Sequence, residues 1–188
     1  MAISRSLRLL ILAITGSSAA PRVLPRVLPR ASEICYGESM SLFCYKEPNG
    51  TPQNVDVADV KYIGAYLRHY GRQNPNKPAF YTMLAPDTPD CAEWGLYTRG
   101  SAQALAKHIG EKTNTSVLYE DIANTIDGGE SPTDASKAAA IIGCLSDGGS
   151  LGVLTNASNP AYHTTDYTSS GYTLSGILVK IVAAAPVS

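Results

Sequence analysis

Histidine and the cysteine patterns of metal sites are scarce in this chain. Its 188 residues include three histidines and four cysteines. No two cysteines have the Cys-x-x-Cys spacing, and none has the neighbouring histidine, that zinc sites use. The Gly-x-Ser-x-Gly, His-Glu-x-x-His and phosphate-loop motifs are missing as well. We therefore expect no metal, no cofactor and no enzyme of these motif-bearing classes.

The apolar run near the N-terminus is too short to cross a bilayer, which needs about 20 apolar residues. It extends from Leu9 to Ile14, follows two arginines and precedes the small residues Ser17 and Ala19. A basic start, a short apolar core and small residues before the cut are typical of a secretory signal peptide. The sequence predicts that residues 1–19 are removed and that the protein is secreted, extracellular and without a membrane anchor.

A repeat of proline and arginine follows, with proline at every fourth position from Pro21 to Pro29. This spacing excludes a regular helix or a central strand. We interpret residues 20–32 as an extended spacer or a pro-segment, with Arg30 as a candidate processing site. A tail that stays attached is the alternative. Residues 33–188 are long enough for a single domain.

Clusters of basic residues are absent from that domain. The first 30 residues hold five arginines and no acidic residue, so a chain of net charge −1 is left with about −6 after their removal. Affinity for nucleic acid or anionic lipid comes from Lys and Arg that neutralise phosphates. We expect no nucleic-acid partner, and a monomer.

All four cysteines lie in the domain: Cys35, Cys44, Cys91 and Cys144. An even number in a secreted chain predicts two disulfides, with three pairings open. Three Asn-x-Ser/Thr sequons, at Asn49, Asn114 and Asn156, predict surface loops and glycosylation. Pro52 follows the first sequon and should reduce its use.

Hydrophobic periodicity predicts interleaved helices and strands without a clean βαβ repeat. The expected fold class is α+β: an antiparallel sheet with two to four helices packed on it, an α/β-sandwich held by disulfides. Trp94 is expected in the core. We predict helices over 55–70, 101–109 and 131–143, strands over 79–84, 91–98, 151–155 and 174–184, a strand followed by a helical turn over 116–126, and a polar loop over 156–171. The strands over 79–84 and 91–98 are expected to pair.

Catalytic residues have to be sought without a motif. Glu93, Arg99 and His108 could form the acid–base set of a secreted ribonuclease. The competing interpretation of His69 and His108 is structural. A protonated histidine near a helix C-terminus is stabilised by the helix dipole. Tyr162, Tyr167 and Tyr172 of the polar loop could form a recognition surface, or could simply pack.

The surroundings of the cysteines form an ordered series along the chain. Residues 34–39 read Ile-Cys-Tyr-Gly-Glu-Ser, 91–94 read Cys-Ala-Glu-Trp, 142–150 read Ile-Gly-Cys-Leu-Ser-Asp-Gly-Gly-Ser, and Ser-Gly opens the stretch 175–182. This order resembles the fungal killer toxin family of the smut-virus, calcium-channel-blocking type. Ile142 and Asp147 stand where that family has a histidine and a second cysteine.

A second resemblance is to the fungal secreted effectors with a necrosis-inducing domain. Val57-Ala58-Asp59-Val60, the strand that Cys91 opens and Tyr119-Glu120-Asp121-Ile122 match the order of that family's elements. The match leaves residues 130–188 without a counterpart.

The killer toxin resemblance implies a disulfide pairing. In the killer toxin family, the opening cysteine pairs with the cysteine of the Gly-Cys turn. This pairing corresponds to Cys35–Cys144 here, which leaves Cys44 to pair with Cys91. The two resemblances together imply a secreted toxin-like or effector-like protein that binds a protein or cell-surface target without catalysis. A small secreted hydrolase is the alternative from another class.

Overall fold

The β-branched segment near the C-terminus forms the centre of the main sheet. Strand β7 (Ile177–Ala183) lies third in a five-stranded sheet of order β1-β6-β7-β4-β3, in which every neighbouring pair is antiparallel. The computed structural model describes residues 35–74, 78–110 and 112–185. The predicted signal peptide and spacer lie outside these residues. The antiparallel sheet, combined with helices, confirms the α+β class.

Short elements complete the fold around this sheet. The other strands are β1 (Phe43–Cys44), β2 (Phe80–Met83), β3 (Glu93–Arg99), β4 (Ala102–His108), β5 (Thr115–Leu118) and β6 (Gly149–Gly152). The α-helices are α1 (Val57–Gly71), α2 (Tyr119–Asp127), α3 (Asp134–Ala138) and α4 (Thr165–Ser169). The 3₁₀ turns are η1 (Cys35–Gly37), η2 (Ala85–Asp87), η3 (Pro89–Cys91), η4 (Ile141–Asp147) and η5 (Pro160–His163). Strands β2 and β5 pair with each other in a separate antiparallel ribbon.

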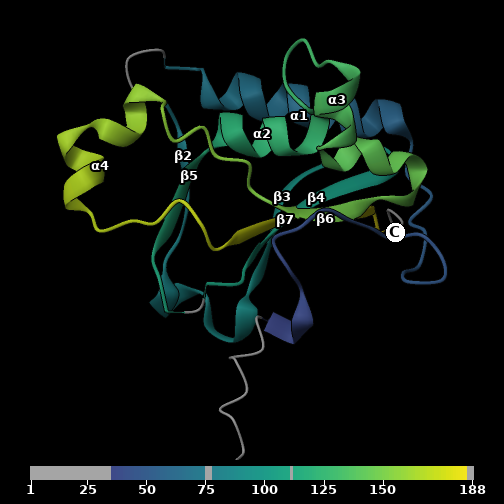
Figure 1. Ribbon diagram of the computed structural model, residues 1–188, viewed down its shortest axis with the longest axis horizontal. Coiled ribbons are helices and arrows are strands. Elements are labelled where there is room, and N and C mark those ends of the chain that lie inside the picture. The colour runs from purple at the N-terminus through teal and green to yellow at the C-terminus, as the bar shows by residue number, and fades with distance from the viewer. Residues whose placement is uncertain (1–34, 75–77, 111, 186–188) are drawn as a thin grey trace, which may run out of the picture. The chain divides into compact units, whose positions relative to one another are not determined.

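The two faces of the main sheet have different coverings. On the helix face, Ala102, Ala104 and Ala106 of β4 are completely buried in the main core, with α1 and α2 lying over this side of the sheet (Figure 1). The opposite face, here called the outer face, carries Lys107 of β4 and Lys180 of β7, because side chains alternate along a strand. The apolar core therefore lies between the sheet and the two helices.

Helix α1 follows the prediction closely. Asp56 caps it by accepting a hydrogen bond from the Ala58 amide at 2.8 Å. Val60, Ile63 and Leu67 recur at three- and four-residue steps and are buried against the sheet. The same periodicity is what indicated the helix in the sequence.

Helices α1 and α2 approach each other closely at a glycine. A Cβ on Gly64 would lie 2.4 Å from a carboxylate oxygen of Asp127, so no larger residue fits without a shift. Asp127 forms a buried ion pair with Arg68 at 2.6 Å, and Arg68 also donates to Asn124 at 3.0 Å. Close contact and a paired buried charge together fix how the two helices are aligned.

The helix predicted over 101–109 is wrong, because this segment is strand β4. Alanine, leucine, lysine and glutamine are all good helix formers, which is why the local sequence favoured a helix. In the structure the segment pairs with β3 on one side and with β7 on the other. Hydrogen bonding to two neighbours outweighs a propensity difference of at most about 1 kcal/mol per residue.

The predicted pairing of strands 79–84 and 91–98 is also wrong. β2 pairs with β5, and β3 pairs with β4 across a turn at Gly100. Trp94, expected in the core, is 37% exposed. Because β3 is an edge strand, its side chains on the helix face lie at the border of the core.

The helix predicted over 131–143 is shorter than expected. The N-cap of α3 is Thr133, which accepts a hydrogen bond from the Ser136 amide. The helix ends at Ala138, and Gly143 lies inside η4.

The segment 156–171, predicted as a polar loop, contains η5 and α4. Three other predictions are confirmed. The strand over 79–84 is β2, the strand over 174–184 is β7, and the strand and helix over 116–126 are β5 and α2.

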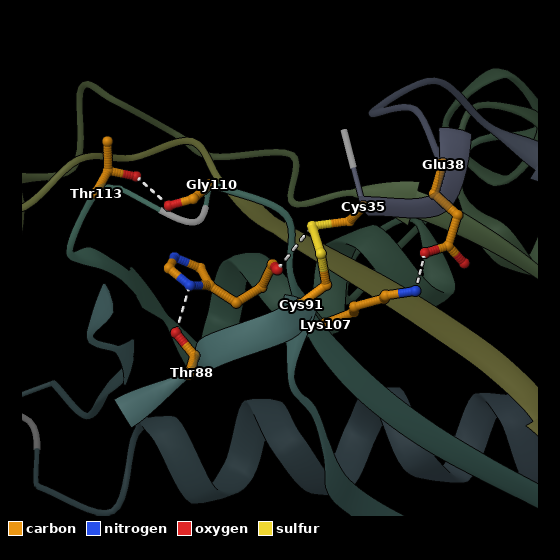
Figure 2. Close-up of a disulfide and its surroundings, with 8 residues drawn as sticks. Cys35, Glu38, Thr88, Cys91, Lys107, Gly110 and Thr113 are labelled. Carbon is orange, nitrogen blue, oxygen red and sulfur yellow. Dashed lines mark hydrogen bonds and ion pairs between the residues drawn. A yellow bond between two sulfur atoms is a disulfide. The ribbon is translucent and has the colours of Figure 1, made fainter. Parts of the chain in front are cut away.

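The disulfide pairing that the killer toxin resemblance implies is wrong. The structure joins Cys44 to Cys144 and Cys35 to Cys91, and Figure 2 shows the second of these bonds. Cys44 lies opposite Gly149 in the β1–β6 pair, which brings it beside η4 and Cys144. The sheet register therefore decides this bond.

The other bond ties η1 to the start of β3. Cys35 Sγ lies 3.4 Å from the carbonyl oxygen of His108, at the end of β4. Cys91 lies two residues before β3, the partner of β4, and the His108 amide donates to the carbonyl of Ala92 at 3.0 Å. Cys35 is thus next to Cys91 because β3 and β4 pair.

An ion-pair network holds the segment after Cys35 on the outer face. Glu38 pairs with Lys107 (Figure 2) and with Lys180 at 3.1 Å, and Lys180 pairs with Glu93 at 2.8 Å. Burial alone would raise the pKa of Glu38, but the hydrogen bonds from the two lysines outweigh it and lower this pKa below the ordinary value. Glu38 is ionised at neutral pH, and the network is balanced in charge.

Disulfide mapping tests this topology. Trypsin alone leaves Cys35 and Cys44 in one peptide, so the non-reduced protein needs cleavage by trypsin and a glutamate-specific protease, which cuts after Glu38. We expect linked peptides for Cys35–Cys91 and Cys44–Cys144, as mass spectrometry would detect. Chain entropy gives the loop of 100 residues that the second bond closes about 5 kcal/mol of stabilisation. A Cys35–Cys144 peptide would contradict the structure.

Candidate functional site

An exposed row of tyrosines runs along helix α1. Tyr62, Tyr66 and Tyr70 are spaced four residues apart, which places them on one side of a helix. Their exposed fractions are 45%, 37% and 40%. Large aromatic side chains rarely gather on a free surface without a use, so this row is a candidate binding surface.

Strand β3 extends the row. Trp94 pairs with Ala106 and Tyr97 with Ala104, so both side chains lie on the helix face of the sheet. The Tyr97 ring stacks on Tyr66 with centroids 3.8 Å apart and lies 6.4 Å from Tyr62. We call Tyr62, Tyr66, Tyr70, Trp94 and Tyr97 the tyrosine surface. The rings of Tyr62, Tyr66 and Tyr97 hold one another, so this part of the surface is pre-organised.

The charge pair of Arg99 and Asp59 borders the tyrosine surface. The Arg99 guanidinium lies over the Tyr62 ring, 4.4 Å from its centroid, and 3.9 Å from the Asp59 carboxylate. Hydrogen bonds from the backbone and hydroxyl of Ser101 lower the pKa of Asp59 below its ordinary value. The edge is therefore polar and the centre aromatic.

A pocket lies at the other side of the molecule, over the β2–β5 ribbon. It has a volume of about 430 Å³, within the range of small-molecule sites. The α4 segment lies beside the ribbon in Figure 1. The lining residues are Pro78, Phe80, Thr82, Ser116, Ala161, Thr164, Asp166, Tyr167 and Tyr172. Of the loop tyrosines predicted for recognition, Tyr167 and Tyr172 line this pocket.

The third loop tyrosine anchors the pocket wall instead. Tyr162 is buried, and its hydroxyl donates to the Asp121 carboxylate at 2.6 Å while it accepts from the Leu118 amide at 2.8 Å. Burial raises the pKa of Asp121, although the hydrogen bond from Tyr162 acts in the opposite direction. For this tyrosine, packing was the correct interpretation.

The candidate ribonuclease residues do not come together. Glu93 lies opposite Lys107 on the outer face, whereas Arg99 lies opposite Ala102 on the helix face, because a β-bulge between Gly95 and Tyr97 reverses the alternation. In a regular strand, their separation of six residues would place both side chains on one face.

His108 is unsuited to acid–base work on an external substrate. Its side chain is completely buried, and Nδ1 lies 2.5 Å from the Thr88 hydroxyl. It ends strand β4, so its predicted place at a helix C-terminus is wrong, whereas His69 does lie in the last turn of α1. In the described part of the chain, no group of three or more His, Cys, Asp or Glu could hold a metal ion.

The three sequons lie in different surroundings. Asn49 and Asn156 are exposed in loops. Asn114 is half-buried, its side-chain oxygen accepts from the Ala85 amide at 3.0 Å, and Ser116 of the same sequon is buried. A glycan is therefore easier to place at Asn49 and Asn156.

Comparison with known proteins gives no match: neither a family model, nor a curated protein, nor a solved structure resembles this chain significantly. Among the described helices, none combines the length and the hydropathy that a bilayer crossing requires.

The tyrosine surface was not identified from the sequence, although part of the signal was there. The four-residue spacing from Tyr62 to Tyr70 marks one side of a helix, but it does not show whether that side is buried or exposed. The sequence does not predict that Tyr97 joins this surface, because its position depends on the bulge in β3 and on β3 lying beside α1.

Replacing Tyr162 with phenylalanine should destabilise the protein. The buried Asp121 carboxylate would lose its hydroxyl donor, at a cost of about 1–3 kcal/mol in urea unfolding at neutral pH. The raised pKa of Asp121 means that its ionisation disfavours the folded state as pH rises above 3.8. The penalty of Tyr162→Phe should therefore shrink as the pH falls and Asp121 takes up its proton.

The matched control is Tyr172→Phe. It removes a phenol hydroxyl that has no hydrogen bond among the described residues, and the free energy of unfolding should not change. Equal effects of the two variants at neutral pH would contradict the anchoring role of Tyr162.

Proposed function

We propose that this protein is a secreted, disulfide-bonded binding protein, toxin-like or effector-like, that attaches to a protein target on another cell without catalysis. The observation that carries the proposal is the tyrosine surface. Tyrosine, tryptophan and arginine are the residues most enriched where proteins bind one another. Here Arg99 lies over the Tyr62 ring, and Trp94 is exposed on the same strand as Arg99.

The stacking of the rings supports a binding role. Tyrosine has few rotatable bonds, and a ring already stacked on its neighbour loses little further freedom when a partner binds. The Tyr66–Tyr97 stack provides such a fixed base. Around it, Tyr62 and Tyr70 are exposed enough to contact a partner directly.

Two disulfides and the signal-like N-terminus support secretion. Disulfides form and persist in oxidising compartments. Cys35–Cys91 and Cys44–Cys144 also tie the start of the domain to β3 and to η4. The target cell is either a competing fungus, as the killer toxin resemblance implies, or a host cell, as the effector resemblance implies. Because the implied disulfide pairing is wrong, element order is what remains of the first resemblance.

The secretion proposal has a direct test. Expressed in a fungal host with its own N-terminus, the protein should accumulate in the medium. Its mass and N-terminal sequence should show that residues 1–19 have been removed, so that the secreted chain starts at Ala20 or, after further processing, after Arg30. A chain retained in the cells with Met1 intact would contradict it.

The binding proposal is tested with a triple variant, Tyr62→Ser, Tyr70→Ser and Trp94→Ser, which leaves the Tyr66–Tyr97 stack in place. Labelled folded protein is applied to fungal cells in growth assays and infiltrated into leaves. The variant should bind responsive cells at least about tenfold more weakly than the original protein, since aromatic residues at the centre of interfaces contribute most of the affinity. Activity should fall in parallel.

The control variant is Tyr36→Ser. Tyr36 is 81% exposed and lies in η1, away from the tyrosine surface. Its replacement should leave binding and activity unchanged. Unchanged binding by the triple variant, or RNA turnover that is lost in Glu93→Gln, would refute the proposal.

A further inference from the structure

The pocket over the β2–β5 ribbon combines aromatic ring faces with hydroxyl groups. Phe80 and Tyr167 stack at 5.1 Å with an angle of 27° between their rings, and Tyr172 meets Tyr167 edge-on at 5.8 Å. The hydroxyls of Thr82 and Ser116 lie 2.7 Å apart on the same face of the ribbon. Apolar walls and polar groups thus meet in one cavity of about 430 Å³.

The polar groups retain capacity for a ligand. The Thr82–Ser116 pair shares one hydroxyl proton, which leaves the other to donate. The Tyr167 hydroxyl donates to the Ser116 carbonyl at 2.7 Å and can still accept. Among the described residues, neither the Asp166 carboxylate nor the Tyr172 hydroxyl has a hydrogen-bond partner. The pocket therefore offers both donors and acceptors.

The charge of the pocket lining limits the classes of ligand that the pocket can bind. Asp166 is the one charged side chain in the lining that the structure describes. A carboxylate repels phosphates, sulfates and carboxylates, whereas it accepts strong hydrogen bonds from hydroxyl groups. A purely aromatic or aliphatic ligand would fill the walls but would leave these polar groups unpaired, which costs binding energy.

We propose that this pocket binds a neutral saccharide unit, with the C–H face of one sugar ring against the aromatic walls and its hydroxyls bonded to Asp166 and to the Thr82–Ser116 pair. A pyranose ring has both an apolar face and a rim of hydroxyl donors and acceptors, which is the combination that the pocket presents. The pocket shares no residue with the tyrosine surface, so this proposal is independent of the proposed protein target.

The rigid wall around Tyr167 supports a preformed site. The buried Tyr162 packs edge-on against both Phe80 and Tyr167, at 5.6 Å and 5.1 Å, and its hydroxyl is fixed by Asp121. A ring already held in place by its neighbours does not have to be ordered when a sugar stacks on it.

The test is a titration of the isotope-labelled protein with methyl glycosides and disaccharides of glucose, mannose and N-acetylglucosamine, followed by NMR. At least one of them should shift the amide signals of β2, β5 and residues 164–172. Asp166→Asn and Tyr172→Ala should each weaken that binding about tenfold, since each removes a contact of the strength of a charge-assisted hydrogen bond or a stacked ring. Tyr172→Phe should weaken it less, because it retains the ring.

Tyr70→Ala is the matched control, as it removes a tyrosine from the tyrosine surface and should leave saccharide binding unchanged. Thermal unfolding of each variant shows whether it is folded. No shift at these positions with any saccharide, shifts that Asp166→Asn and Tyr172→Ala leave unchanged, or tighter binding of phenol than of every saccharide would overturn the proposal.

Discussion

The packing of helices α1 and α2 on the sheet face that carries the alanines of β4 is the constraint on which the rest of the fold depends. Ala102, Ala104 and Ala106 have no exposed surface and lie in the same core cluster as Ile63 and Ile126. Small side chains at these three positions let the helices lie close to the sheet. This closeness brings α1 within reach of the edge strand β3, where Tyr97 can stack on Tyr66.

The outer face of the sheet has a different kind of support. On this face, the support comes from the segment from Cys35 to Cys44, which is fixed at both ends by disulfides. Between them, Glu38 reaches Lys107 and Lys180. Covalent bonds restrict the unfolded chain, and the ion pairs set the position of the segment. A small disulfide-bonded domain gains from this arrangement the stability that a second helix layer would otherwise supply.

The two candidate binding features share one principle. In each, aromatic rings from elements far apart in the sequence support one another: α1 and β3 in the tyrosine surface, and β2 and the α4 region in the pocket. Support from a neighbouring ring lowers the freedom that a side chain has left to lose. With eleven tyrosines and two phenylalanines, the chain combines ring surface with hydroxyl groups that tolerate water.

The sequence by itself determined the elements whose pattern is local and strong. The steps of Val60, Ile63 and Leu67 indicated α1, and the β-branched run of β7 and the strand and helix after Ser116 were also identified correctly. The even number of cysteines indicated two disulfides. Only the tertiary structure decided the rest. β4 is a strand because two neighbours bond to it, against its own propensity. The register of β1 with β6 selects Cys144 for Cys44, and the bulge in β3 sends Glu93 and Arg99 to opposite faces. These outcomes depend on hydrogen bonds between residues far apart in the chain, and no local pattern in a single sequence records them.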